Sequence, residues 1–159
     1  MVHVGIGYDV HSMAPGRALI LGGVAISHPK GLQGHSDADV LMHAICDAVL
    51  GAIGEGDIGT FFPNTDRRWK DAASKVFLEE AARQVRFHGG RIVNVDATII
   101  AQAPKVMPHA EAMKRNVAEA LGISARKIGL KATTNEGLGF IGREEGIAAL
   151  AVAGVALPE

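Results

Sequence analysis

The stretch DVLMHAICDAVLGAIG, residues 39–54, decides how the rest of the chain is interpreted, because the period of the sequence changes here. Apolar residues such as Leu41 and Ile45 recur at the three- and four-residue spacing of one helix face. Before it, residues 2–10 alternate as a strand does, and 18–26 is a second strand candidate that two glycines interrupt, as a bulge or bend would. The chain is therefore predicted to open with two strands followed by a helix.

Downstream, the pattern continues with helices and strands. A loop-like segment covers 54–66, helices are predicted over 72–87 and 108–121, and strands over 91–101, 127–134 and 146–157. No linker, repeat or low-complexity tract divides the chain, and the last strand is apolar on both faces. We therefore predict a single layered α+β domain over residues 1–159, with a mixed sheet packed against helices and covered on both faces. Another subunit could supply part of that cover.

Composition narrows the class of partner. The 159 residues carry 16 Lys and Arg against 17 Asp and Glu, a formal net charge of −1, which argues against nucleic acid or a polybasic membrane contact. The apolar run 147–157 is shorter than the ~18 residues of a spanning helix, and the N-terminal residues lack a secretory pattern. The single Cys46 cannot form an internal disulfide and suits a reducing compartment. We expect a cytoplasmic protein that binds a small molecule.

The chain has seven histidines, and histidine is a common metal ligand. Asp9 and His11 are two residues apart in a predicted strand, so their side chains leave the same face. His43 on the following helix is the nearest imidazole on a rigid element, and one Asp with two His leaves the open position of a catalytic zinc site. From the spacing alone the alternative is equally acceptable, in which Asp-x-His is a chance strand pattern and His43 is a hydrogen-bonded helix residue. Cys46 is expected to be a buried apolar residue rather than a ligand.

The segment GHSDAD places His35 and Ser36 just before the helix, where free backbone N–H groups favour an anion such as phosphate. The alternative is ordinary capping of the helix by Ser36, Asp37 or Asp39.

A second polar segment, KATTNEGLGFIGREEG, spans 131–146. Its glycines fit G-x-G-x-x-G literally, but no helical pattern follows, so a dinucleotide fold is rejected. Thr133, Thr134 and Glu136 follow a predicted strand and offer hydroxyl groups to phosphate and a carboxylate to a hard divalent cation. The alternative is an ordinary turn.

Several of these motifs, taken in order along nearly the whole chain, resemble one family. They are YDVH at 8–11, GHSDADVLMH at 34–43, GDIG at 56–59, FPNTD at 62–66, NVDATIIAQAPK at 94–105 and KATTNE at 131–136. This set resembles the 2-C-methyl-D-erythritol 2,4-cyclodiphosphate synthases of the non-mevalonate isoprenoid route. The resemblance implies a homotrimer with active sites between subunits, and a zinc ion held by Asp9, His11 and His43.

The resemblance also implies a reaction. The substrate would be 4-diphosphocytidyl-2-C-methyl-D-erythritol 2-phosphate, cyclised with release of CMP, which makes the enzyme a phosphorus–oxygen lyase. Zinc would hold the β-phosphate, and Mg²⁺ or Mn²⁺ on Glu136 would bridge the α- and β-phosphates, while His35 and Thr134 would steady the transition state. A zinc-dependent phosphohydrolase and a non-catalytic nucleotide-binding protein are the alternatives.

Substrate contacts follow from the same resemblance. Ser36 would lie near phosphate, and the sugar would meet Asp57, Ile58, Gly59 and the loop that holds Phe62, Asn64 and Asp66. The cytidine would be enclosed by Ala101, Pro104, Lys105, Val106, Met107 and Thr133. Phe140 and Arg143 match positions near the phosphates or near the trimer axis. This chain departs from the family by having Asn64 in place of Asp and Glu144 in place of Gly.

Overall fold

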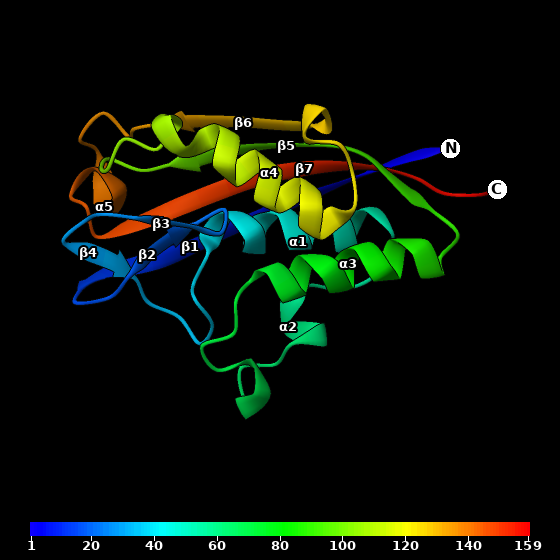
Figure 1. Ribbon diagram of the computed structural model, residues 1–159, viewed down its shortest axis with the longest axis horizontal. Coiled ribbons are helices and arrows are strands. Elements are labelled where there is room, and N and C mark those ends of the chain that lie inside the picture. Colours follow the sequence, from blue (N-terminus) through cyan, green and yellow to red (C-terminus); the bar gives the residue numbers. More distant parts are fainter.

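The core of the structure is one mixed sheet. The computed structural model describes residues 1–159 and contains a five-stranded sheet of order β4-β1-β7-β5-β6 (Figure 1). The long strand β1 pairs antiparallel with β7, and β5 pairs antiparallel with β7 but parallel with β6. The predicted mixed sheet of an α+β fold is confirmed. The strands are β1 Val2–Pro15, β4 Lys30–Leu32, β5 Arg91–Ile100, β6 Ile128–Thr133 and β7 Gly146–Ala156.

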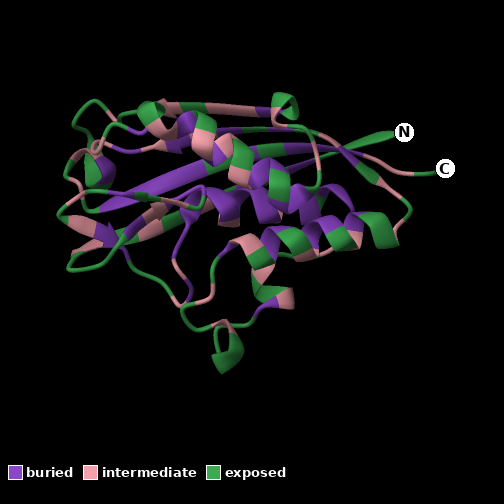
Figure 2. Cartoon of the chain, in the orientation of Figure 1, coloured by how far each residue is buried: buried purple, intermediate pink, exposed green.

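Helices cover one face of this sheet. Helix α1, Val40–Ala52, lies directly against β1 and β7, and α3, Lys75–Phe87, packs on its outer side (Figure 1). Helix α4, Ala110–Leu121, packs against α3 and β6. Buried residues concentrate on α1 and on the sides of the other helices that face it (Figure 2). The short helices are α2 Ile58–Phe61, α5 Gly139–Gly142, η1 Arg67–Trp69, η2 Met107–His109 and η3 Ala125–Lys127.

Two glycines of β1 let the backbone of α1 lie on the strand. A Cβ atom at Gly5 would sit 2.0 Å from the carbonyl oxygen of Ala48, and one at Gly7 would sit 1.9 Å from that of Ala44. Only residues without a side chain allow so close an approach. This packing sets His43, the residue before Ala44, beside the next residues of β1.

The segment 18–26 is a hairpin, so its prediction as one interrupted strand is wrong. Strands β2, Leu19–Leu21, and β3, Val24–Ile26, pair antiparallel around Gly22 and Gly23. Both glycines have positive φ, 55° and 71°, which is what a two-residue hairpin turn requires. The buried carboxylate of Asp39 accepts both of their backbone N–H groups, at 3.0 and 2.7 Å, and thus ties the turn to the start of α1.

The second face of the sheet is bare in this chain. Side chains of β1 that point away from α1, such as Val4 and Ile6, are 69% and 68% exposed, and Leu150 and Val152 of β7 are also exposed. This chain covers only one face of the predicted sheet, because all the long helices lie on one side (Figure 1). Cover by another subunit stays a prediction. None of the helices has the length and apolar character that crossing a membrane requires.

Candidate metal site and substrate pocket

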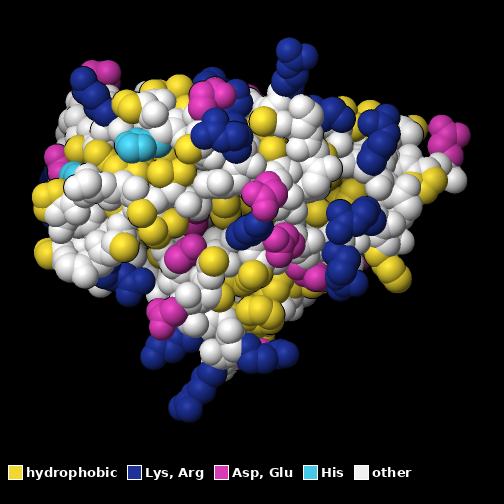
Figure 3. Space-filling view, in the orientation of Figure 1, with side chains coloured by type: hydrophobic (Ala, Val, Ile, Leu, Met, Phe, Trp, Pro, Cys, Tyr) yellow, Lys and Arg dark blue, Asp and Glu magenta, His cyan; other side chains and the backbone are white.

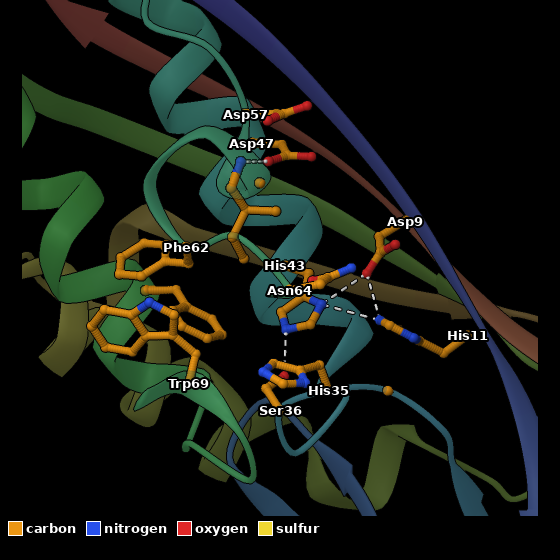
Figure 4. A pocket seen from close by; sticks show the side chains of 14 residues that line it. Asp9, His11, His35, Ser36, His43, Asp47, Asp57, Phe62, Asn64 and Trp69 are labelled. Atoms are coloured by element: carbon orange, nitrogen blue, oxygen red, sulfur yellow. Dashed lines mark hydrogen bonds and ion pairs between the residues drawn. The ribbon is translucent and has the colours of Figure 1, made fainter. Parts of the chain in front are cut away.

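Three potential metal ligands meet where β1 passes α1. Asp9 Oδ2 lies 2.9 Å from His11 Nε2 and 3.0 Å from His43 Nδ1, and the two ring nitrogens are 3.1 Å apart. Figure 4 shows the three side chains pointing toward one another. Asp9 and His11 share a face because they are two apart on a strand, as predicted, and His43 reaches them because α1 lies so close to β1. The structure brings the predicted triad together.

The chemistry of this triad fits a metal ion. Its ligand atoms all lie within 4.8 Å of one another, and one carboxylate with two imidazoles is a donor set typical of catalytic zinc. Each ring also uses its other nitrogen on the protein. His11 Nδ1 donates to the carbonyl of Gln33 at 2.8 Å, and His43 Nε2 lies 2.9 Å from Ser74 Oγ. Such outer contacts are what orient histidine ligands around a metal.

Hydrogen bonds and charges within the triad shift the pKa values of Asp9 and His11. Burial alone would raise the pKa of Asp9, but hydrogen bonds with His11 and His43 outweigh it and hold that pKa well below its usual range. Burial likewise opposes protonation of His11, but the hydrogen bond and the charge of Asp9 outweigh it and raise the pKa of the ring. The carboxylate thus stays ionised and attracts positive charge, whether a proton or a metal cation.

A polar cavity of about 360 Å³ opens above the triad (Figure 4). Its size suits a small ligand. Helix α2 forms one wall, held by the Asp57 side chain, which accepts from Thr60 N, and by Asp47 of α1, which accepts from Ile58 N at 2.8 Å. The aromatic side chains of Phe62, Trp69 and Phe77 also line the cavity. Besides the triad, the predicted residues that line the cavity are His35, Ser36, Asp57, Ile58, Gly59, Phe62 and Asn64.

The residues around the start of α1 are shared between capping and the cavity. Asp39 caps the helix by accepting from Met42 N at 3.1 Å, so the capping alternative holds for that residue. Ser36 is buried, and its hydroxyl lies 3.1 Å from His43 Nε2. His35 Nε2 donates to the carbonyl of Asp66 at 3.1 Å. The Asp66 carboxylate itself caps η1 and pairs with Arg68, outside the cavity lining.

A second pocket, of about 280 Å³, lies at the ends of β5 and β6 and shares no residue with the first. It is formed by the segment after β5 together with the last residues of β6 and the residue that follows. Every residue predicted to enclose cytidine lines it, and Thr134 joins them. The predicted residues in this pocket are Ala101, Pro104, Lys105, Val106, Met107, Thr133 and Thr134.

Four predicted residues line neither pocket: Asp66, described above, and Glu136, Phe140 and Arg143. Glu136 follows Thr134 in a turn, with φ 52° and its N–H donating to Thr134 Oγ1 at 3.2 Å. Arg143 pairs with Glu145 at 2.8 Å, and Phe140 is 41% exposed on α5. Glu144, one of the two departures from the family, has φ 57°, a left-handed conformation that costs a residue other than glycine about 1–2 kcal/mol.

Sequence reasoning missed the second layer of contacts. Gln33 and Ser74 hold the two imidazoles, and Asp47 holds the start of α2, but these residues carry no motif of their own. Cys46 is buried and points to the carbonyl of Phe77, as expected of an apolar-type cysteine.

Comparisons with known proteins agree with one another. The model of the YgbB family matches residues 2–156. The chain is 59% identical over 149 residues to the 2-C-methyl-D-erythritol 2,4-cyclodiphosphate synthase of Bordetella avium, covering 94% of this chain and 92% of that protein. It is 58% identical over 157 residues to the bifunctional enzyme IspD/IspF of Mesorhizobium japonicum, covering 99% of this chain and 39% of that one. The chain thus spans about two fifths of the length of the bifunctional relatives that it matches.

Solved structures give the same result. The bifunctional IspDF of Campylobacter jejuni superposes with a TM-score of 0.95 at 43% identity, covering 100% of this chain and 43% of that one. A CDP complex of IspF from Plasmodium falciparum superposes with a TM-score of 0.87 at 34% identity, covering 99% of this chain and 97% of that one.

Proposed function

The chain belongs to the YgbB family, and from that premise we propose that it converts 4-diphosphocytidyl-2-C-methyl-D-erythritol 2-phosphate to 2-C-methyl-D-erythritol 2,4-cyclodiphosphate with release of CMP. The reaction is a cyclising phosphorus–oxygen lyase step of the non-mevalonate isoprenoid pathway. One observation carries the proposal: the Asp9, His11 and His43 triad opens into the same cavity as the residues matched to the phosphate and sugar sites.

The chemical difficulty is to bring two phosphate groups together. Like unit charges about 4 Å apart repel by ~4 kcal/mol at an effective dielectric constant of 20. Asp9, His11 and His43 would hold Zn²⁺, which when bound supplies a Lewis acid for the β-phosphate. His35 is oriented by the bond from its Nε2–H to the Asp66 carbonyl and lines the cavity beside the Ser36 hydroxyl, so both side chains would lie against a phosphate group. Positioning and charge stabilisation then account for most of the catalysis.

The sugar and the base would be held in different ways. Helix α2 offers Asp57 and the backbone around Ile58 and Gly59 to the erythritol hydroxyls, with Phe62 and Asn64 beside them. The second pocket would take cytidine between Pro104, Lys105 and their neighbours, where backbone groups edge a space of limited size. Glu136 would hold Mg²⁺ or Mn²⁺ against the α- and β-phosphates.

We further propose that three copies of the chain complete the site, as a homotrimer with active sites between subunits. Two features support this assembly: the sugar and cytidine pockets share no residue within one chain, and the far face of β1 and β7 is apolar and exposed. In the assembly Phe140 and Arg143 would lie near the phosphates or at the trimer axis.

The other partners follow from charge. The net charge is −1, and the face in Figure 3 intersperses basic with acidic side chains over the helices, which favours a small cytidine diphosphate substrate over nucleic acid or a membrane surface. We propose that the enzyme works in the cytoplasm.

Product analysis tests the function. The protein is incubated with the substrate, Zn²⁺ and Mg²⁺, and the products are followed by phosphorus NMR. We expect a cyclic diphosphate and CMP in equal amounts. A linear phosphate product would instead identify a zinc-dependent phosphohydrolase, and binding without turnover would identify a nucleotide-binding protein; either result would overturn the proposal.

A further inference from the structure

Ser74 stands at the start of α3 but does not cap it. It is the N-cap residue, yet its hydroxyl makes no capping bond to the helix, although a serine cap usually contributes ~1 kcal/mol. The residue is 0% exposed, so water cannot replace the missing partner. The hydroxyl must therefore be engaged elsewhere in the protein.

Its partners are a carboxylate and a proposed metal ligand. Ser74 Oγ hydrogen-bonds Asp37 Oδ1 and lies 2.9 Å from His43 Nε2, while Asp37 Oδ2 accepts the backbone N–H of Ser74 at 3.0 Å. Asp37 thus holds Ser74 through both its backbone and its side chain. The Asp37 backbone N–H also bonds the carbonyl of Ala72, which joins the two segments once more.

The directions of these hydrogen bonds follow from counting protons. An ionised carboxylate only accepts, so the single hydroxyl proton of Ser74 goes to Asp37. The oxygen of Ser74 is then left to accept, and His43 must donate to it from Nε2–H. A neutral imidazole with its proton on Nε2 has its lone pair on Nδ1, the nitrogen that faces Asp9 and His11.

This arrangement matters because Asp9 favours the opposite tautomer. Asp9 Oδ2 lies 3.0 Å from His43 Nδ1 and would accept a proton placed there, which would remove the lone pair that a metal needs. An acceptor on the other side of the ring counters that pull. Ser74 is that acceptor, because its own proton is committed to Asp37, whereas Ser36 Oγ, 3.1 Å from the same Nε2, already accepts the backbone N–H of Ala38 and keeps its proton.

We infer that Asp37 and Ser74 are positioning residues that hold His43 in the tautomer and orientation of a metal ligand. The inference rests on the metal site of the proposed function and adds two residues that the triad needs. Outer contacts of this kind typically change metal affinity by about 10- to 100-fold. The contacts with Asp37 and His43 would also explain why the Ser74 hydroxyl makes no capping hydrogen bond to α3.

Cobalt binding tests the inference without relying on turnover. The metal-free protein is titrated with Co²⁺, whose visible absorption reports both affinity and coordination geometry, and zinc affinity follows by competition. We expect Ser74→Ala to weaken binding by about 10- to 100-fold and to alter the cobalt spectrum, and Ser74→Thr, which keeps the hydroxyl, to recover much of the loss. Circular dichroism checks that each variant is folded.

Asp37→Asn is the sharper variant. If the amide NH₂ takes the place of Oδ1, Ser74 must accept from it and donate to His43, which moves the ring proton to Nδ1 and blocks the metal. If the NH₂ takes the place of Oδ2, it opposes the N–H of Ser74. Both orientations should weaken metal binding, the first by moving the ring proton and the second by loosening Ser74 beside His43, and wild-type metal affinity in Asp37→Asn would overturn the role of Asp37.

The matched control is Ser124→Ala. Ser124 caps η3 conventionally, accepting from Arg126 N, so this variant loses a serine hydroxyl far from the triad and should keep full metal affinity. Wild-type cobalt affinity and spectrum in Ser74→Ala would overturn the inference, as would equal losses in Ser74→Ala and Ser74→Thr. Failure of the wild type to bind metal, or full binding by His43→Ala, would overturn the metal site itself.

Discussion

Replacing Gly7 with alanine should force α1 away from β1. The added Cβ would lie 1.9 Å from the carbonyl oxygen of Ala44 and 2.8 Å from the backbone nitrogen of Ala48. Both neighbours are helix backbone, so no flexible side chain can give way. Ordinary contact begins at 3.4 Å, and the strand and helix would therefore have to separate by up to about 1.5 Å, the difference between 3.4 and 1.9 Å.

The separation acts on stability and on the metal site at once. Overpacking of this kind costs about 1–3 kcal/mol, and at about 2–4 °C per kcal/mol for a chain of this size Tm should fall by roughly 2–12 °C. Asp9 and His11 move with β1, whereas His43 moves with α1. Because metal–ligand distances tolerate only about 0.2 Å, we expect metal affinity to fall with Tm, and a displacement near 1 Å to reduce turnover about 100-fold.

Gly51→Ala is the matched control on the other side of the same interface. Its added Cβ would meet only Gly5 Cα and the Ile6 carbonyl oxygen, both at 3.9 Å, and alanine is favoured over glycine in a helix by ~1 kcal/mol. Calorimetry and metal titration of both variants should show Gly51→Ala unchanged or more stable with full metal affinity. A Gly7→Ala protein with wild-type Tm and wild-type metal affinity would refute the reasoning.

The remaining predictions concern single side chains and the base pocket. His43→Ala should leave the chain folded but without zinc, and a full zinc complement by metal analysis would reject His43 as a ligand. Glu136→Gln should lower turnover strongly, with partial recovery as Mg²⁺ is raised and no change in zinc content; turnover equal to wild type would count against the second metal. Asp39→Asn should lower the free energy of unfolding, measured with denaturant, by about 1–3 kcal/mol. The Asp39 carboxylate accepts three backbone N–H groups, and the amide nitrogen of Asn would have to face at least one of them. An unchanged unfolding midpoint would contradict this. CMP should bind better than AMP in calorimetric titration, since a purine overfills the second pocket, and equal affinities would move the base site elsewhere.

Patterns of short range predicted the elements that pack most tightly. The helix predicted over 39–54 is observed as Val40–Ala52, because one of its faces must be buried against the sheet and its start carries a capping Asp39. The metal triad could also be predicted from patterns of short range. Alternation on β1 places Asp9 and His11 on one side, and a helix histidine nearby supplies the third ligand.

Local patterns could not distinguish conformations that share a composition. Two adjacent glycines suit a bulge as well as a hairpin turn, and the choice at Gly22 and Gly23 depends on Asp39, a residue distant in sequence that accepts their N–H groups. Likewise a serine before a helix looks like a cap. Only the fold shows that the Ser74 hydroxyl turns toward Asp37 and His43 instead.

The separation of the two pockets has a different physical origin. The triad sits where β1 crosses α1, whereas Thr133 and Thr134 lie where β5 and β6 end, and no residue lines both pockets. Sequence motifs specify which chemical groups a reaction needs, but not whether one chain can bring them together. In the proposed trimer, the exposed apolar sheet face would be buried against another copy, which would stabilise the assembly and bring the second pocket of one chain to the first pocket of its neighbour. Substrate binding and subunit association should therefore be coupled, so that CMP binding weakens as the assembly is diluted into monomers.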